Sequence, residues 1–300
     1  MRKRKGDKID GWVVLDKPVG LGSTPAVSKV RRLFGAQKAG HGGTLDPLAS
    51  GVLPIALGEA TKTVPFVMDG RKEYRFTLHF GEARSTEDAE GEVTETSDVR
   101  PTDGAIRAAL AAFVGTIEQT PPAFSALKID GKRAYDLARA GETVDLKPRQ
   151  VRIDRLDLLA RPDADHADFG VSCGKGTYIR SLGRDLARAL GTVGHLSFLR
   201  RTAAGPFREE AAISLSKLEA LGHIPALLGA LAPVATALDD IPALALTEAQ
   251  ADRLRQGQPV FLTRDAPPSG ALLRAEAGSR LVALVRSDGV ALKPVRVFNL

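Results

Sequence analysis

The sequence predicts an α+β fold, built on a mixed or antiparallel sheet and followed by a small β-rich unit. Strand-like alternation and helix-like apolar spacing are interspersed along the 300 residues, without a regular strand–helix–strand period. A hydrophobic content of 43% is enough for a large core. After a stretch rich in Ala, Leu and Pro at 224–242, short strand patterns continue to the last residue. We therefore expect a large domain over 1–239 and a small domain over 240–300.

The first part of the chain predicts a strand, a helix and a second strand. The apolar run at 12–15 is typical of a short strand. Ser23 or Thr24 is expected to cap a helix, which Gly35 should end. Apolar residues alternate with polar ones over 73–80, which predicts a strand with one packed face.

The middle and the end of the chain continue this mixed order. Asp130-Gly131 is a turn signal that precedes a short helix, which Gly141 should close. Thr247 and Gln250 form a capping-box pattern for a helix that ends near Gly257. The other predicted elements are helices at 106–114 and 177–190, strands at 151–155 and 169–173, and three or four short strands after 257, with a turn at 288–289.

The positive charge of the chain is concentrated in two segments. Residues 1–42 hold ten Lys/Arg and three Asp/Glu, and residues 178–201 hold five Arg and one Asp. Residues 82–103, by contrast, hold eight acids and two arginines. Segregated positive charge favours a polyanionic partner such as nucleic acid, although many single basic patches are only solvated faces.

Composition argues against several kinds of site. Cys173 is the one cysteine, so neither a disulfide nor a thiolate zinc site can form within the chain, and a reducing compartment is expected. The five histidines show no close metal-ligand spacing, so we expect no metal. No secretory signal or membrane-length apolar run is recognised. We therefore expect a cytoplasmic protein without membrane contact, and a monomer, since nothing in the sequence demands oligomerisation.

The most informative segment is the glycine-rich loop at 40–51, which carries His41 and a single acid, Asp46. Its glycines allow close backbone approaches, and Pro47 fixes the direction in which the chain leaves Asp46. On pattern alone, an Asp-Pro pair in such a loop is most often a turn former. A carboxylate held at the edge of a cleft is the functional alternative.

Short motifs that recur in order over residues 10–215 resemble the signature of the TruB family of tRNA pseudouridine synthases. The motifs are Asp16-Lys17-Pro18-x-Gly20, the loop 40–51, Leu57-Gly58-Glu59-Ala60-Thr61-Lys62, Tyr74-Arg75, Ser125-Ala126-Leu127-Lys128, the segment 173–180, and Leu199-Arg200-Arg201. Two positions depart from the pattern: Gly42 stands where the family commonly has Thr, and Ser85 where it often has Asp.

The resemblance implies an isomerase that converts uridine to pseudouridine at position 55, in the T-arm loop of tRNA, without a cofactor. It also implies that the target base is flipped out of its stack. The implied partner is the tRNA T-arm stem-loop, not DNA. Because uracil must leave C1′, rotate and rejoin through C5, the enzyme needs a nucleophile or base beside the sugar and a pocket that retains the free base.

Three residues match the family's catalytic positions. Asp46 matches the catalytic acid; the sequence leaves open whether it attacks C1′, attacks C6 of the base or removes a sugar proton. Arg180 matches the arginine that pairs with this acid, and a neighbouring cation favours the ionised carboxylate. Tyr74 matches the aromatic that stacks on the uracil, with a hydroxyl available for proton transfer. On pattern alone, Tyr74 is a core aromatic, and Arg184 and Arg188, on the helix face of Arg180, are solvated.

Five further residues are assigned to the substrate site by resemblance. His41 matches the residue that fills the space left by the flipped base; on pattern alone it is a turn histidine bonded to nearby backbone. Tyr178 and Leu199 match positions that line the base pocket, although each alone is an ordinary buried residue. Lys17 and Asp88 match positions that help to order the surroundings of the active site.

Two larger segments also acquire roles by resemblance. Residues from about 120 to 149 match an insert that closes over the RNA loop, with positive charge from Lys132, Arg133, Lys147 and Arg149. Residues 240–300 match a PUA-like RNA-binding domain. Because this segment holds eight Lys/Arg and six acids, we expect its contribution to RNA affinity to be small.

Two alternative functions remain open at this point. One is a tRNA-binding folding chaperone that pries open and refolds the T-arm; the presence of Asp46, Tyr74 and Arg180 favours catalysis, although one protein can have both activities. The other is a guide-RNA-dependent relative of the dyskerin type. The short C-terminal domain and the lack of long lysine-rich tails weigh against it.

Overall fold

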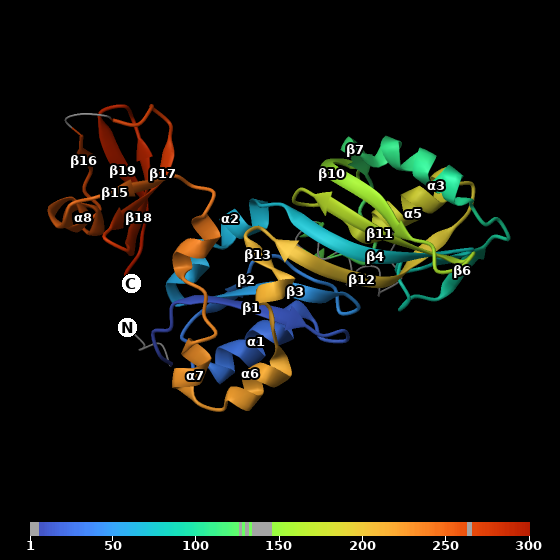
Figure 1. The fold of residues 1–300 in the computed structure, drawn as a ribbon, viewed down its shortest axis with the longest axis horizontal. Coiled ribbons are helices and arrows are strands. Elements are labelled where there is room, and N and C mark those ends of the chain that lie inside the picture. The colour runs from blue at the N-terminus through green and yellow to red at the C-terminus, as the bar shows by residue number, and fades with distance from the viewer. Residues whose placement is uncertain (1–5, 126–127, 130–131, 134–145, 263–265) are drawn as a thin grey trace.

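The computed structural model describes residues 6–125, 128–129, 132–133, 146–262 and 266–300. Within these residues, the chain forms a ten-stranded sheet with the order β14-β1-β3-β12-β4-β11-β10-β7, to which β2 and β13 are added at β3 and β12 (Figure 1). Most neighbouring strands are antiparallel, whereas the β1–β14 and β3–β12 pairs are parallel. The predicted mixed sheet is therefore confirmed. Its strands are β1 (Gly11–Lys17), β2 (Ala39–His41), β3 (Ser50–Leu57), β4 (Lys72–Phe80), β7 (Gly115–Gln119), β10 (Arg149–Ala160), β11 (His166–Cys173), β12 (Gly194–Ala204), β13 (Phe207–Arg208) and β14 (Ile213–Ser214).

One face of this sheet is covered by helices. Apolar side chains of the sheet and of α1, α3, α5 and α6 form one continuous core, with Val30, Ile106, Leu182 and Leu218 as examples from the four helices. Helix spacing turns these residues toward the sheet, as the apolar periodicity predicts. The helices of this part are α1 (Ser23–Leu33), α2 (Val64–Asp69), α3 (Asp103–Leu110), α5 (Ile179–Ala189), α6 (Leu215–Leu221) and α7 (Ile224–Leu228).

Strand β1 is buried on both of its faces. Val13 and Leu15 belong to the helix-covered core, while the alternate residues Trp12 and Val14 pack into a second apolar cluster on the opposite face. Side chains of the C-terminal unit, including Phe298, reach this second cluster. This explains why residues 12–15 form an uninterrupted apolar run, since a strand covered on both sides shows no polar alternation.

The C-terminal unit is a five-stranded sheet with the order β15-β17-β18-β19-β16 (Figure 1). Helix α8 packs Ala251 and Leu254 into its core, and the predicted Thr247–Gln250 capping box is present at the start of the helix. The β-rich C-terminal unit is therefore confirmed. Its elements are β15 (Ala243–Ala245), α8 (Glu248–Arg255), β16 (Val260–Phe261), β17 (Leu272–Ala277), β18 (Arg280–Ser287) and β19 (Ala291–Val297).

Two hairpins complete the described strands. β5 (Glu82–Arg84) pairs with β6 (Val93–Thr96), and β8 (Lys128–Ile129) pairs with β9 (Lys132–Arg133). The turn predicted at 130–131 lies outside the described residues. The short helix that Gly141 was expected to close lies outside the described residues.

Two local predictions were wrong. Neither Ser23 nor Thr24 caps α1, because the N-cap residue is Gly22 and Ser23 is the first residue of the helix. The helix predicted over 106–114 ends as an α-helix at Leu110 and continues as one 3-10 turn, and Val114 is exposed. In both cases the terminus was displaced by a few residues, which is the usual error of pattern-based boundaries.

Candidate active site

The Asp46 loop joins β2 to β3 and is fixed from several sides. The buried Ser23 hydroxyl accepts a hydrogen bond from the Leu45 amide and donates one to the Leu45 carbonyl, each at 2.8 Å. Ser23 is therefore used to anchor this loop instead of capping α1. Where β3 begins, Gly51 has a φ of +96°, and a Cβ there would lie 2.2 Å from the Arg201 carbonyl oxygen. Only glycine fits this close approach.

Arg201 is the main internal support of the loop. Its guanidinium is almost completely buried and donates hydrogen bonds to the carbonyls of Gly43 at 3.0 Å, Thr44 at 3.3 Å and Val52 at 2.7 Å. A planar guanidinium suits this task because it presents donors in fixed directions. The resemblance placed Arg201 in a motif, but nothing in the sequence separates this buried arginine from a surface one.

Replacing Arg201 with methionine should therefore destabilise the protein. The substitution keeps the apolar volume but leaves three backbone carbonyls without their donor, so we expect the free energy of unfolding to fall by about 3 kcal/mol or more. Urea denaturation of the two proteins measures this difference. Arg155→Met, at a site where the side chain is 65% exposed, is the matched control and should change stability by less than about 0.5 kcal/mol. Equal effects of the two substitutions would contradict the supporting role of Arg201.

Arg180 contacts Asp46 from the start of α5. One of its terminal nitrogens, Nη2, lies 3.0 Å from Asp46 Oδ2 and donates to the Phe124 carbonyl at 2.8 Å, and Nη1 donates to the Thr86 carbonyl at 2.8 Å. Asp88 Oδ2 lies 3.6 Å from Arg180 Nε. The Arg180 side chain is 5% exposed, whereas that of Asp46 is 37% exposed. The arginine is thus a fixed, buried partner of a carboxylate that solvent and substrate can reach.

Asp46 and Arg180 line a cavity of about 610 Å³ together with Tyr74, Tyr178 and Leu199. Tyr74 comes from the start of β4, Tyr178 precedes α5, and Leu199 lies on β12. The structure thus brings together five of the eight residues that the sequence singled out. Asp69 also lines the cavity, but Asp46 is the carboxylate that is paired with the buried Arg180. The aromatic rings and this paired carboxylate give the cavity the character of a site for a flat polar ring beside a charged group.

Tyr74 and Tyr178 are both held by polar neighbours. Burial raises the pKa of Tyr74, partly offset by the nearby charge and hydrogen bond of Arg201, so the hydroxyl is protonated at neutral pH. The buried Gln119 side chain accepts from the Tyr178 amide at 2.8 Å and donates to the Tyr178 carbonyl at 3.1 Å. Arg149 lies over the Tyr178 ring, 4.9 Å from its centroid. Sequence reasoning missed Gln119, since a lone glutamine carries no signal.

The other three predicted residues lie around the cavity and do not line it. Lys17 is fully buried and donates to the carbonyls of Pro18, Leu21 and Pro47, the residue after Asp46. Burial lowers the pKa of Lys17 to about 8, although the charge of Asp46 opposes this shift. Asp88 is buried behind Arg180. His41 is half-buried on β2, where its Nδ1 accepts from the Gly43 amide at 3.4 Å, and burial lowers its pKa.

The two departures from the family pattern have a structural setting. A Cβ at Gly42 would lie 2.6 Å from a methyl carbon of Val67, so the larger residue common in the family would require Val67 to move. In the acidic segment, Ser85 accepts from the Glu92 amide at 3.2 Å, and Glu87 adopts a left-handed φ of +63°. This backbone conformation is uncommon for a residue with a side chain, and it places Glu87 against α5.

One expectation about α5 was wrong. Arg184 is not solvated: its side chain is 16% exposed and pairs with Glu87 and Asp185. Arg188 is exposed, as expected. Helix spacing correctly places Arg184 on the same face of α5 as Arg180. It could not predict that the chain turn at Glu87 brings a carboxylate to this face, where it pairs with Arg184.

Comparison with known proteins identifies the relatives of this architecture. Family models match residues 31–179 (TruB family pseudouridylate synthase, N-terminal domain), 180–239 (tRNA pseudouridylate synthase B C-terminal domain) and 242–298 (pseudouridine synthase II TruB, C-terminal). The chain is 57% identical to tRNA pseudouridine synthase B of Gluconacetobacter diazotrophicus, covering 99% of this chain and all of the relative. Its identity to the protein of the same name in Caulobacter vibrioides is 55%, over 100% and 99% of the two chains.

Solved structures share the fold at lower identity. One chain of a Cbf5-Nop10-Gar1 complex superposes with a TM-score of 0.73 and 28% identity, over 96% of this chain and 84% of that one. A chain of an H/ACA RNP bound to a substrate RNA containing 2′-deoxyuridine has a TM-score of 0.75 at 24% identity, over 100% and 92%, which supports the fold alone.

Proposed function

The chain belongs to the TruB family of pseudouridine synthases, and we propose that it converts uridine to pseudouridine at position 55, in the T-arm loop of tRNA. It is an isomerase that acts on tRNA, in agreement with relatives named tRNA pseudouridine synthase B that are 55% to 57% identical over nearly the whole chain. The observation that carries the proposal is the Asp46–Arg180 pair at the wall of an aromatic-lined cavity.

The reaction breaks the bond from N1 of uracil to C1′ and forms a bond from C5 to C1′. The C5 proton is lost and N1 gains a proton, so atoms and electrons balance without an oxidant or a second substrate. We propose Asp46 as the nucleophile or base, because its carboxylate is the accessible member of the ion pair. Arg180, with its terminal nitrogen 3.0 Å from Asp46 Oδ2, holds that carboxylate in place.

We propose that the remaining site residues hold the base and the loop around it. Tyr74 stacks on the flipped uracil and has a protonated hydroxyl to offer, while Tyr178 and Leu199 enclose the ring. His41 fills the space left in the RNA. Lys17 fixes the backbone at Pro47, and Asp88 lies behind Arg180, so both act by position.

We also propose a boundary between the catalytic domain, 1–239, and the PUA-like C-terminal domain, 240–300, with the RNA-closing insert at about 120–149. None of the helices in the described part of the chain is long and apolar enough to cross a membrane. We propose that the protein acts as a monomer in the cytoplasm. A stand-alone enzyme is favoured over a guide-dependent one because identity is 57% to a tRNA-modifying relative and 28% to the Cbf5 chain.

An isolated T-arm stem-loop should be both a ligand and a substrate. Recognition of a folded loop rests largely on phosphates and shape, so binding should weaken steeply as salt rises. Lys147 and Lys175 are exposed, and Lys175 lies at the rim of the cavity. Changing each to Gln should reduce the slope of log affinity against log salt by about one.

The matched control removes the same charge elsewhere. Lys217→Gln, at an exposed position on α6 outside the cavity lining, should leave the slope unchanged. A hairpin that binds without salt dependence, or that is not modified, would show that recognition lies elsewhere in the tRNA.

A further inference from the structure

Three histidines that are distant in the sequence occupy facing positions on neighbouring strands. His79 of β4 pairs in register with His166 of β11 on one side and with His195 of β12 on the other. Directly facing residues project from the same face of a sheet, with Cβ atoms about 5 Å apart. The His79 and His166 rings stack at 4.5 Å between centroids, and the His195 ring meets His79 edge-on at 4.9 Å.

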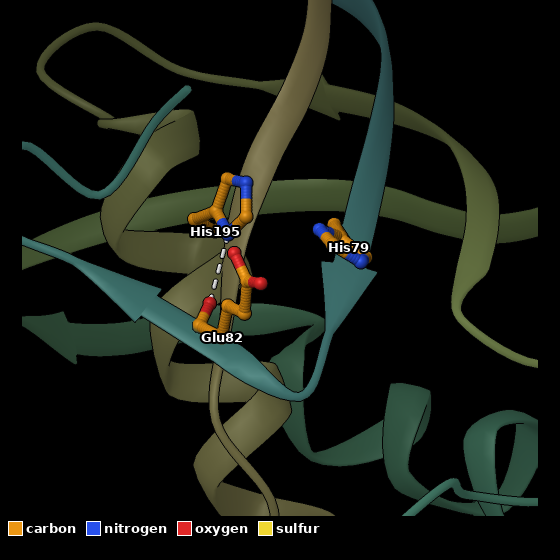
Figure 2. Close-up of side chains that lie close together, drawn as sticks. All are labelled: His79, Glu82 and His195. Carbon is orange, nitrogen blue, oxygen red and sulfur yellow. Dashed lines mark hydrogen bonds between the residues drawn. The ribbon is translucent and has the colours of Figure 1, made fainter. Parts of the chain in front are cut away.

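A carboxylate lies near two of these imidazoles. Gly81, with a φ of +96°, turns the chain between β4 and β5 and brings Glu82 beside His79 and His195 (Figure 2). One potential ligand atom from each of these three side chains lies within 4.8 Å of the other two. His195 Nδ1 donates to the Glu82 carbonyl at 2.8 Å, which leaves the lone pair of its Nε2 free.

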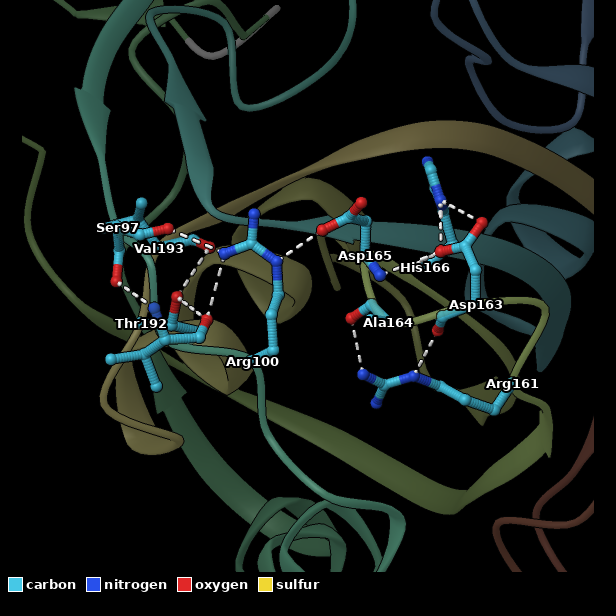
Figure 3. A network of polar contacts seen from close by, with 10 residues as sticks. Ser97, Arg100, Arg161, Asp163, Ala164, Asp165, His166, Thr192 and Val193 are labelled. Carbon is cyan, nitrogen blue, oxygen red and sulfur yellow. Dashed lines mark hydrogen bonds and ion pairs between the residues drawn. The ribbon is translucent and has the colours of Figure 1, made fainter.

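The surroundings of the cluster are held by a polar network (Figure 3). Asp163 accepts from the His166 ring at 2.9 Å and from two backbone amides at 2.8 Å. Arg100 pairs with Asp165 and donates to the Ser97 carbonyl at 2.7 Å. This network fixes His166, whose ring stacks on that of His79, and so limits where the His79 ring can lie.

The charges near the cluster do not prevent cation binding. Arg84 lies 3.1 Å from Glu82 Oε2, so one carboxylate oxygen can keep this ion pair while the other turns to a cation. Arg100 is balanced by Asp165, and Asp163 adds a further negative charge beside His166. Glu82 is 36% exposed, which gives an ion a route from solvent.

We propose that His79, Glu82 and His195 form a binding site for Zn²⁺ or a chemically similar divalent transition metal, with a fourth coordination position open. Two imidazole nitrogens and one carboxylate oxygen are the donor set that such ions prefer. Coordination needs the three donors to close from their present spacing to a mutual spacing of about 3.5 Å, which is within the reach of side-chain rotation. The ion would join the ends of β4, β5 and β12.

The site is separate from the catalytic cavity. His79 follows Leu78 on β4 and therefore points to the opposite face from Leu78, which packs beneath α5 near Gly183. Tyr74 lies four residues before Leu78 on the same strand, so the two side chains point to the same face of the sheet. Tyr74 packs against the helix-covered core on that face. The proposal thus concerns a structural ion, and it holds whether or not the proposed isomerase activity is confirmed.

Titration of the untagged full chain with ZnCl₂ tests the proposal. The protein is first freed of metal with a chelator, and isothermal calorimetry then measures stoichiometry and affinity. We expect one Zn²⁺ per chain, and an affinity at least about tenfold weaker in Glu82→Gln and in His79→Gln. His223→Gln is the matched control, because His223 is exposed and immediately precedes α7, which lies far from β6, the partner strand of β5 (Figure 1). The Zn²⁺ affinity of this variant should equal that of the parent.

Melting curves recorded without metal establish that each variant is folded. Added Zn²⁺ should then raise the melting temperature of the parent and of His223→Gln more than that of the two site variants. The proposal is overturned if the parent binds no Zn²⁺, or if the two site variants bind it as tightly as the parent. It is also overturned if His223→Gln loses affinity as much as they do.

Discussion

Asp46→Asn is expected to reduce isomerisation by about 10⁴-fold or more while tRNA affinity changes little. Asparagine keeps the shape of the side chain and fits the same loop, which Ser23, Lys17 and Arg201 hold in place. It lacks the charge and nucleophilicity that either chemical role of Asp46 requires. Single-turnover measurements at saturating enzyme separate this loss of rate from any loss of binding.

An exposed aspartate that does not line the cavity provides the control. Asp157→Asn, on β10, removes a carboxylate that is 48% exposed and pairs only with Arg155 among the described residues, so turnover should equal that of the parent. Turnover by Asp46→Asn at the parental rate would remove Asp46 from the chemistry.

Arg180→Lys is expected to slow turnover by about 10²- to 10³-fold, far more than it weakens tRNA binding. The guanidinium serves Asp46 and the carbonyls of Thr86 and Phe124 at once, and an ammonium cannot keep this planar arrangement. Because the pair is partly buried, we also expect the free energy of unfolding to fall by about 2 kcal/mol or more. Rate and affinity are measured on the same stem-loop.

Arg188→Lys is the matched control, since it makes the same change at an exposed position on α5. It should alter neither rate nor stability. If Arg180→Lys lost affinity and turnover in equal proportion, Arg180 would be a phosphate contact and not a partner of Asp46.

Much of the fold could be predicted from local patterns. Alternation along residues 73–80 and the capping box at Thr247 depend on near neighbours, and both were confirmed. The start of α1 was placed wrongly because Ser23 has a distant partner, Leu45, that the local pattern does not contain. The end of the helix predicted over 106–114 was placed too late, because no clear stop signal directly follows Leu110, where the α-helix ends.

The site was predictable only in part, because its residues are brought together by contacts between distant parts of the sequence. Asp46 and Arg180 are linked in the sequence by family resemblance alone, and the structure supplies their contact. Arg201 and Gln119 act through buried hydrogen bonds, and these bonds could not be predicted from the residue types alone. The histidine cluster was missed because strand register, and not sequence spacing, brings His79, His166 and His195 together.

Guide-independent isomerisation of tRNA can be tested by incubating the purified protein with one unmodified tRNA transcript, without guide RNA, and mapping pseudouridine at single-nucleotide resolution. We expect conversion at position 55 of the T-arm loop by the parent protein, and none by Asp46→Asn. A transcript without pseudouridine at position 55, or with the same conversion by both proteins, would contradict this expectation.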